Sequence, residues 1–201
     1  WIPTYARKIK TIATGDFFKN SIRYSGPDRK NGNYENVVAR SVMTVFHMDN
    51  FKKDAKSMAQ YLEKNMTMDE LDETANYFDR MSAACGEECK DLFVKKDIHC
   101  WVATFAEFAK YSLPDSEFAR FAKAVKKELN DRVINGNSYD SLDAMNGTTG
   151  KPVVQAKINL YIALMKEFLH IEDVKEENNT VENDETAADT AESQEESVLD
   201  F

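Results

Sequence analysis

One segment, Asp97–Tyr111, carries the apolar pattern around which the rest of the sequence is arranged. It reads D-I-H-C-W-V-A-T-F-A-E-F-A-K-Y, and its apolar residues recur at the spacing of an α-helical face: Ile98, Trp101, Val102, Phe105, Phe108 and Ala109. Each large side chain contributes about 1.5–3 kcal/mol when it is fully buried. Because three aromatic rings on one face exceed what a surface helix can hide, we expect other helices to cover this segment.

The same helical spacing recurs along most of the chain, and no alternating strand pattern of useful length occurs. Loops are expected at 25–33 and 130–150, where Gly, Asn, Ser and Asp cluster. We expect helices over residues 2–14, 16–22, 34–48, 51–62, 67–86, 87–94, 118–129 and 151–169, and one helical turn around 139–145. The predicted fold class is therefore all-α, an irregular multi-helix bundle.

Local signals mark the starts of several helices. Thr67 followed by Glu70 forms a capping box, and Asp49 is suited to cap the helix after it. Pro114 ends the central helix and begins the next one, because proline is tolerated in a first turn but not inside a helix. We expect that next helix, which contains Phe118, to pack antiparallel on the central one.

The charge of the chain is distributed unevenly. The net charge is −9, but residues 172–201 hold twelve acidic residues and one lysine, so the rest carries +2 and residues 1–30 carry +5. Low apolar content with high charge predicts disorder. We therefore expect a helical domain at 1–170 and a disordered acidic tail at 171–201. Because the chain begins with Trp1 rather than Met, we expect the domain to be the C-terminal part of a longer protein.

Several classes of protein find no support in the sequence. No apolar run approaches the roughly 18 residues that span a bilayer, and no signal peptide opens the chain, so we expect a cytoplasmic location. The sequence contains no glycine-rich phosphate cradle and no nucleophile–base pattern around its three histidines. We predict no catalytic residue, no cofactor and no membrane contact, and whether the chain has enzymatic activity stays open.

The cysteines raise the question of a metal site. Cys85, Cys89, His99 and Cys100 are residue types that zinc accepts. However, His99 and Cys100 are adjacent and would point about 100° apart on a helix, so the four side chains converge with difficulty. We predict no metal site and no disulfide in a cytoplasmic protein, and we favour buried thiols, although the role of these cysteines stays open.

A resemblance to a known family supplies a functional direction. It rests on F-F-K-N-S-I-R-Y (17–24) with N-Y-E-N-V-V-A-R (33–40), on the amphipathic stretch 51–64, and on 95–111 followed by 118–129. These segments, within residues 14–170, resemble the helical region after the ParB/sulfiredoxin-like domain in the domain-of-unknown-function family at the N-terminus of GmrSD-type restriction proteins and related phage-encoded ParB-like proteins.

The resemblance implies a helical accessory domain of a DNA-associated phage or phage-defence protein, located in the host cytoplasm if a phage encodes it. The family's Asp-Gly-Gln-x-Arg motif lies in the preceding α/β domain and is absent from this chain, so no catalytic residue is carried over. The expected partner is DNA, because basic residues bind phosphate. The candidates are Arg23, Arg29, Lys30 and Arg40. The alternative interpretation is a set of surface or capping residues.

The last residues of the chain suggest a second hypothesis. Val198, Leu199 and Phe201 lie beside the terminal carboxylate, which resembles the acidic, Phe-terminated tails of bacterial single-stranded-DNA-binding proteins, although the proline before the last Phe is missing. This resemblance implies docking of a protein partner, and a purely solubilising tail is the alternative. The chain would then be a stand-alone interaction or scaffold protein. The sequence does not predict an oligomeric state.

Overall fold

The computed structural model describes residues 3–145 and 150–171, and this part of the chain is helices joined by turns. The helices are α1 (Pro3–Ala13), α2 (Asp16–Asn20), α3 (Gly26–Lys30), α4 (Asn33–Phe46), the 3-10 helix η1 (Met48–Asn50), α5 (Ala55–Asn65), α6 (Met68–Cys85), α7 (Ile98–Phe108), α8 (Asp115–Lys127), α9 (Tyr139–Asp143) and α10 (Lys151–Leu169). The described residues contain no strand, only an isolated bridge between Ile134 and Asn137. The predicted all-α class is confirmed.

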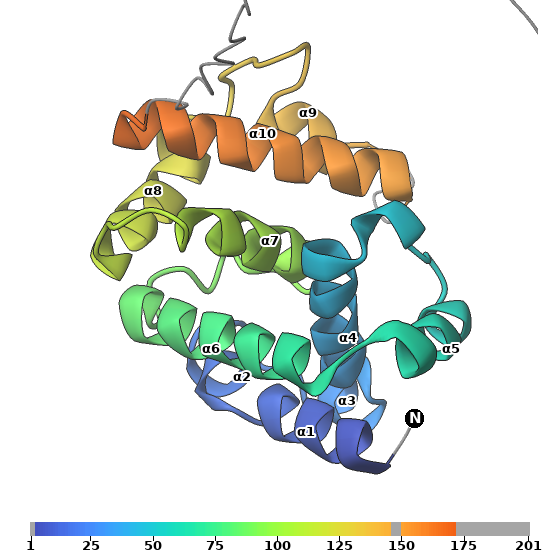
Figure 1. The fold of residues 1–201 in the computed structure, drawn as a ribbon. Coiled ribbons are helices and arrows are strands. Elements are labelled where there is room, and N and C mark those ends of the chain that lie inside the picture. Colours follow the sequence, from blue (N-terminus) through green and yellow to red (C-terminus); the bar gives the residue numbers. More distant parts are fainter. Residues whose placement is uncertain (1–2, 146–149, 172–201) are drawn as a thin grey trace, which may run out of the picture.

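Helix α7 lies at the centre of the core, as its apolar pattern predicts. In Figure 1, α10, α7 and α6 follow one another from top to bottom, and α4 runs across the direction of α6 and α7. The Trp101 ring is fully buried and stacks on Tyr161 of α10 with 4.4 Å between ring centroids. Phe105, also fully buried, meets Phe118 of α8 edge to face at 4.8 Å.

The neighbours of α7 differ from the expected ones. Its closest packing is with α4 and α10, whereas α8 packs mainly on α6 and α10. Helix α8 reaches α7 through long aromatic side chains, including Phe121, whose ring centroid lies 6.1 Å from that of Trp101. The proline turn therefore brings the two aromatic faces together without making α8 the main partner of the central helix.

The helix caps show one confirmed prediction and one correction. Thr67 and Glu70 form the predicted capping box: the Glu70 backbone N–H donates to the Thr67 hydroxyl at 3.2 Å, and the Thr67 N–H donates to the Glu70 carboxylate at 2.8 Å. Asp49, in contrast, lies inside η1. Asp54 caps α5 instead, by accepting from the Ser57 N–H at 2.8 Å, because Phe51 adopts extended backbone and delays the helix.

Two short segments were predicted wrongly. The expected loop at 25–33 contains α3, which Ser25 caps and whose five residues are too few to show helical periodicity. The expected helix at 87–94 is a series of turns, closed by bonds such as Leu92 N–H to the Cys89 carbonyl at 2.9 Å. Gly86 explains the difference, because its φ of 53° lies in the left-handed region and turns the chain out of α6.

Two further expectations concern membranes and the tail. No helix within residues 3–145 and 150–171 is long and apolar enough to cross a membrane. The predicted disordered tail lies outside the described residues from 172 onward, and so do Val198, Leu199 and Phe201.

Candidate anion-binding site

A basic concavity of about 250 Å³ lies between α4 and the segment that leads into α7. Its lining residues are Asn33, Asn36, Val37, Arg40, Lys95 and Lys96. We call it the Arg40 pocket. The lining includes three cations and two side-chain amides and no carboxylate, so it offers hydrogen-bond donors to an anion.

The start of α4 positions one wall of the pocket. Gly32 has a φ of 69°, a left-handed conformation that glycine adopts without strain, and α4 begins at the next residue. Asn33, Asn36 and Arg40 then recur three and four residues apart and share one face of the helix. The adjacent Val37 is buried and holds this face against the core.

Arg40 has a hydrogen-bond donor that the fold does not use. One terminal nitrogen donates to the Lys53 carbonyl at 2.9 Å. Its Nε atom is buried and has no hydrogen-bond partner among the described residues. A buried donor without a partner costs about 1–3 kcal/mol, and burial also lowers the pKa of Arg40 from its ordinary value. The Arg40 side chain therefore has a hydrogen-bond donor that no contact within the described residues satisfies.

The two lysines of the pocket are engaged by carboxylates at its edge. Lys95 Nζ lies 2.5 Å from the carboxylate of Asp28, and Lys96 Nζ lies 2.6 Å from that of Asp143. The hydrogen bond from Lys95 lowers the pKa of Asp28. Side chains as exposed as Lys95, at 48%, gain little from an ion pair, typically about 0–1 kcal/mol. Both lysines can therefore turn toward a stronger anion at small cost.

A buried charged cluster lies close to the pocket. Lys157 of α10 forms an ion pair with Asp97 at 2.6 Å, and both side chains are almost completely buried, at 1% and 2% exposed. Burial raises the pKa of Asp97, although the hydrogen bond and the charge of Lys157 act to lower it. Burial, and next the charge of Arg40, lower the pKa of His99 to about 3, so this ring is neutral near neutral pH.

Within residues 3–145 and 150–171, the buried side-chain polar atoms without a hydrogen-bond partner gather in this region. Within the described part of the chain, the buried side-chain nitrogen and oxygen atoms without a partner are Arg40 Nε, Asp97 Oδ2 and His99 Nε2. Buried polar groups are nearly always paired in folded proteins, so such atoms commonly mark a functional region or a bound water. The Arg40 pocket is therefore the strongest candidate site.

The structure places the other predicted basic residues outside the pocket. Arg29 and Lys30 are exposed on α3, which packs on α4. A hydrogen bond with Tyr24 raises the pKa of Arg29, so its side chain is directed to that ring. Arg23 is 77% exposed and forms an ion pair with Asp91 at 2.5 Å. Of the four candidates, only Arg40 lines the concavity.

Sequence analysis missed Lys95 and Lys96. The available signal was a pair of lysines directly before the central apolar segment, where Asp97 and His99 point inward. Nothing in the sequence shows that this pair meets Asn36 and Arg40, because only the folded chain brings these residues together.

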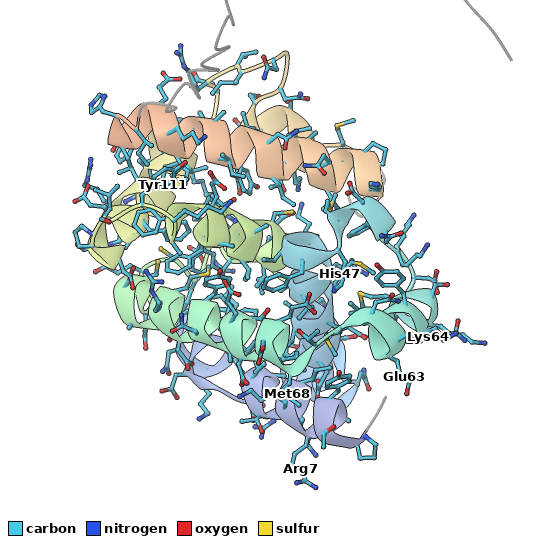
Figure 2. The ribbon with its side chains drawn as sticks, in the orientation of Figure 1. Arg7, His47, Glu63, Lys64, Met68 and Tyr111 are labelled. Atoms are coloured by element: carbon cyan, nitrogen blue, oxygen red, sulfur yellow. The ribbon has the colours of Figure 1, made fainter. Side chains whose placement is uncertain are left out.

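The thiols and His47 have structural surroundings. Cys85, Cys89 and Cys100 are buried free thiols. No group of three or more His, Cys, Asp or Glu residues suited to a metal ion occurs in the described residues. His47, labelled in Figure 2, has Nε2 3.3 Å from Glu70 Oε2 and Nδ1 3.5 Å from the Tyr61 hydroxyl. It thereby connects α4, α5 and α6.

Comparison with known proteins gave no relative from which a role could be transferred. No protein-family model matches the chain, and no curated protein or solved structure matches it either.

Proposed function

We propose that this domain binds nucleic acid through backbone phosphates at the Arg40 pocket, as the helical accessory part of a ParB-like, DNA-associated phage or phage-defence protein. In this role it positions nucleic acid, or a partner, for chemistry located upstream in the longer protein. The proposal is carried by Arg40, which has a buried, unpartnered Nε and lines a concavity together with two further cations and no carboxylate.

Phosphate oxygens fit this pocket for chemical reasons. A guanidinium group and lysine ammonium groups make the charge-assisted hydrogen bonds that phosphate prefers. A volume of about 250 Å³ admits one phosphate group, and no aromatic side chain lines the pocket for a base to stack on. Contacts of this kind position a protein on nucleic acid without reading sequence, so we expect binding with little sequence preference.

The test compares full-length variants in binding to a short DNA duplex at low salt. Arg40→Met keeps the apolar stem and removes the donors, and Lys96→Gln removes a second cation. Each should weaken binding about tenfold, the equivalent of roughly 1.5 kcal/mol for one charge-assisted hydrogen bond. Lys64→Gln is the matched control, because Lys64 is exposed on α5 (Figure 2) and its replacement removes the same charge elsewhere.

Two results would overturn the proposal. One is no detectable binding by the wild-type protein at low salt. The other is an equal loss in all three variants, because that outcome would show a response to total charge rather than to the pocket. Thermal unfolding of each variant shows whether the fold is retained.

The alternative hypothesis, a scaffold that recruits a partner through Val198, Leu199 and Phe201, concerns residues outside the described part of the chain. It stays a prediction, and the described contacts supply no observation in its favour.

A further inference from the structure

A second basic surface lies on α8, away from the Arg40 pocket. Its cations recur along the side of the helix that faces away from the buried aromatic rings: Arg120, Lys123, Lys126 and Lys127. Two hollows adjoin these cations. One, of about 450 Å³, is lined in part by Phe168 of α10, and the other, of about 550 Å³, lies between α8 and residues 88–92. Lys123 and Lys127 line both hollows. We call this surface the α8 basic face.

Two of the four cations of this face form no ion pair within the described residues, although Glu88 attracts Lys127 and Asp143 attracts Lys126. Arg120 pairs with Glu117 at 2.6 Å, and Lys123 pairs with Glu88. Lys126 and Lys127 are exposed, and neither forms an ion pair with any residue in 3–145 or 150–171. Glu88, Asp91 and Glu128 also line the two hollows, but the four cations outnumber these three carboxylates, so the face attracts an acidic segment.

The chain itself contains an acidic segment, residues 172–201, shortly after the end of α10. Helix α10 ends beside α8: the Phe168 ring lies 6.1 Å from that of Phe121, and the Arg120 guanidinium lies 4.5 Å above it. The part of the chain that the structure describes ends three residues after Phe168. The next thirty residues, 172–201, carry a net charge of −11. A chain of that length reaches about 100 Å when fully extended, so every part of it can reach α8.

We propose that residues 172–201 bind the α8 basic face of the same molecule, with their carboxylates on Lys126 and Lys127. Tethering favours this occupant over an acidic partner, because a short covalent link raises the effective concentration to about the millimolar range. This inference does not depend on nucleic-acid binding.

Amide NMR spectra of the full chain provide the test. The Lys126→Glu/Lys127→Glu variant should shift the amide resonances of residues 172–201 several times further than the control Lys56→Glu/Lys64→Glu. The control reverses two exposed lysines on α5 and changes the net charge equally. Raising the salt concentration should move the wild-type tail resonances toward those of the α8 variant, because salt screens exposed charges.

Three outcomes would overturn the proposal. Tail resonances that respond equally to both variants would show a general charge effect, and resonances that respond to neither would show no contact. A shift that grows with protein concentration would assign the acidic segment to a second copy of the chain. Unchanged core resonances in both variants confirm that the fold is retained.

Discussion

The two ends of α7 bury opposite kinds of chemistry. From Trp101 to the C-terminus of the helix, the rings of Trp101, Phe105 and Phe108 are fully buried and pack on other aromatic rings. At its N-terminus, Asp97 and His99 are equally buried, but each has a polar atom without a partner. The aromatic part of the helix is therefore an ordinary apolar core, whereas the N-terminal end buries polar atoms that lack hydrogen bonds.

The difference indicates what each end does for the protein. Aromatic burial stabilises the fold directly, through removal of apolar area from water. A buried ion pair such as Asp97–Lys157 is a weak source of stability, because desolvation of both charges offsets their attraction. Since the charged end adjoins the Arg40 pocket, we infer that it holds that pocket in place rather than stabilising the core.

The largest expected effect tests the aromatic end. Trp101→Ala removes the largest fully buried side chain and leaves a cavity between α7, α8 and α10, so the free energy of unfolding should fall by about 4 kcal/mol. Denaturant unfolding measures it. A loss below about 1 kcal/mol would mean that the aromatic end is not the centre of the core.

A slightly smaller effect tests the charged end. Lys157→Met leaves Asp97 buried without its partner and should lower the free energy of unfolding by about 3 kcal/mol. The double variant Asp97→Asn/Lys157→Met removes both charges and should recover most of this loss. If the double variant is no more stable than the single one, the ion pair is a net source of stability and the contrast between the two ends fails.

The smallest effect, taken over a single pH unit, comes from the protonation of His99. Because the pKa of His99 is about 3 in the folded protein and ordinarily 6.5, the unfolded chain binds a proton below pH 6.5 that the folded one does not. His99 therefore lowers the free energy of unfolding as pH falls from about 6.5 toward 3, by about 1.4 kcal/mol per pH unit. Asp97 acts in the opposite direction, since its raised pKa lets the folded protein take up a proton first.

A comparison with His99→Gln isolates the histidine. The stability advantage of the wild type over the variant should shrink at each step from pH 6.5 to pH 4, as measured by denaturant unfolding in matched buffers. Parallel pH profiles for the two proteins would contradict this prediction, because they would show that the pKa of His99 is the same in the folded and unfolded states.

The sequence predicts the aromatic end far better than the charged end. Helical spacing of large apolar residues places α7 and α10 correctly, because burial of such residues follows from their type. Helix α3 has only five residues, so it shows no helical period. The apolar residues at 87–94 predict a helix, but the positive φ of Gly86 ends α6 and changes the direction of the chain before them. Short elements of this kind depend on backbone geometry at single residues.

The candidate site was predictable only in part. Arg40 belongs to the segment 33–40 on which the family resemblance rests, and the structure gives it a buried donor. The pairing of Lys96 with Asp143, and of Lys157 with Asp97, joins residues 47 and 60 positions apart in the chain. A polar residue carries no period that would indicate burial, so the sequence alone cannot separate Asp97 from a surface aspartate.

The most direct test of phosphate binding at the Arg40 pocket is the salt dependence of affinity for duplex DNA. The logarithm of the association constant is plotted against the logarithm of salt concentration for the wild type, Arg40→Met and Lys64→Gln. Loss of one phosphate contact reduces the slope by about 0.9, so Arg40→Met should be less steep by that amount while Lys64→Gln matches the wild type. Equal slopes for the wild type and Arg40→Met would contradict phosphate binding at this pocket.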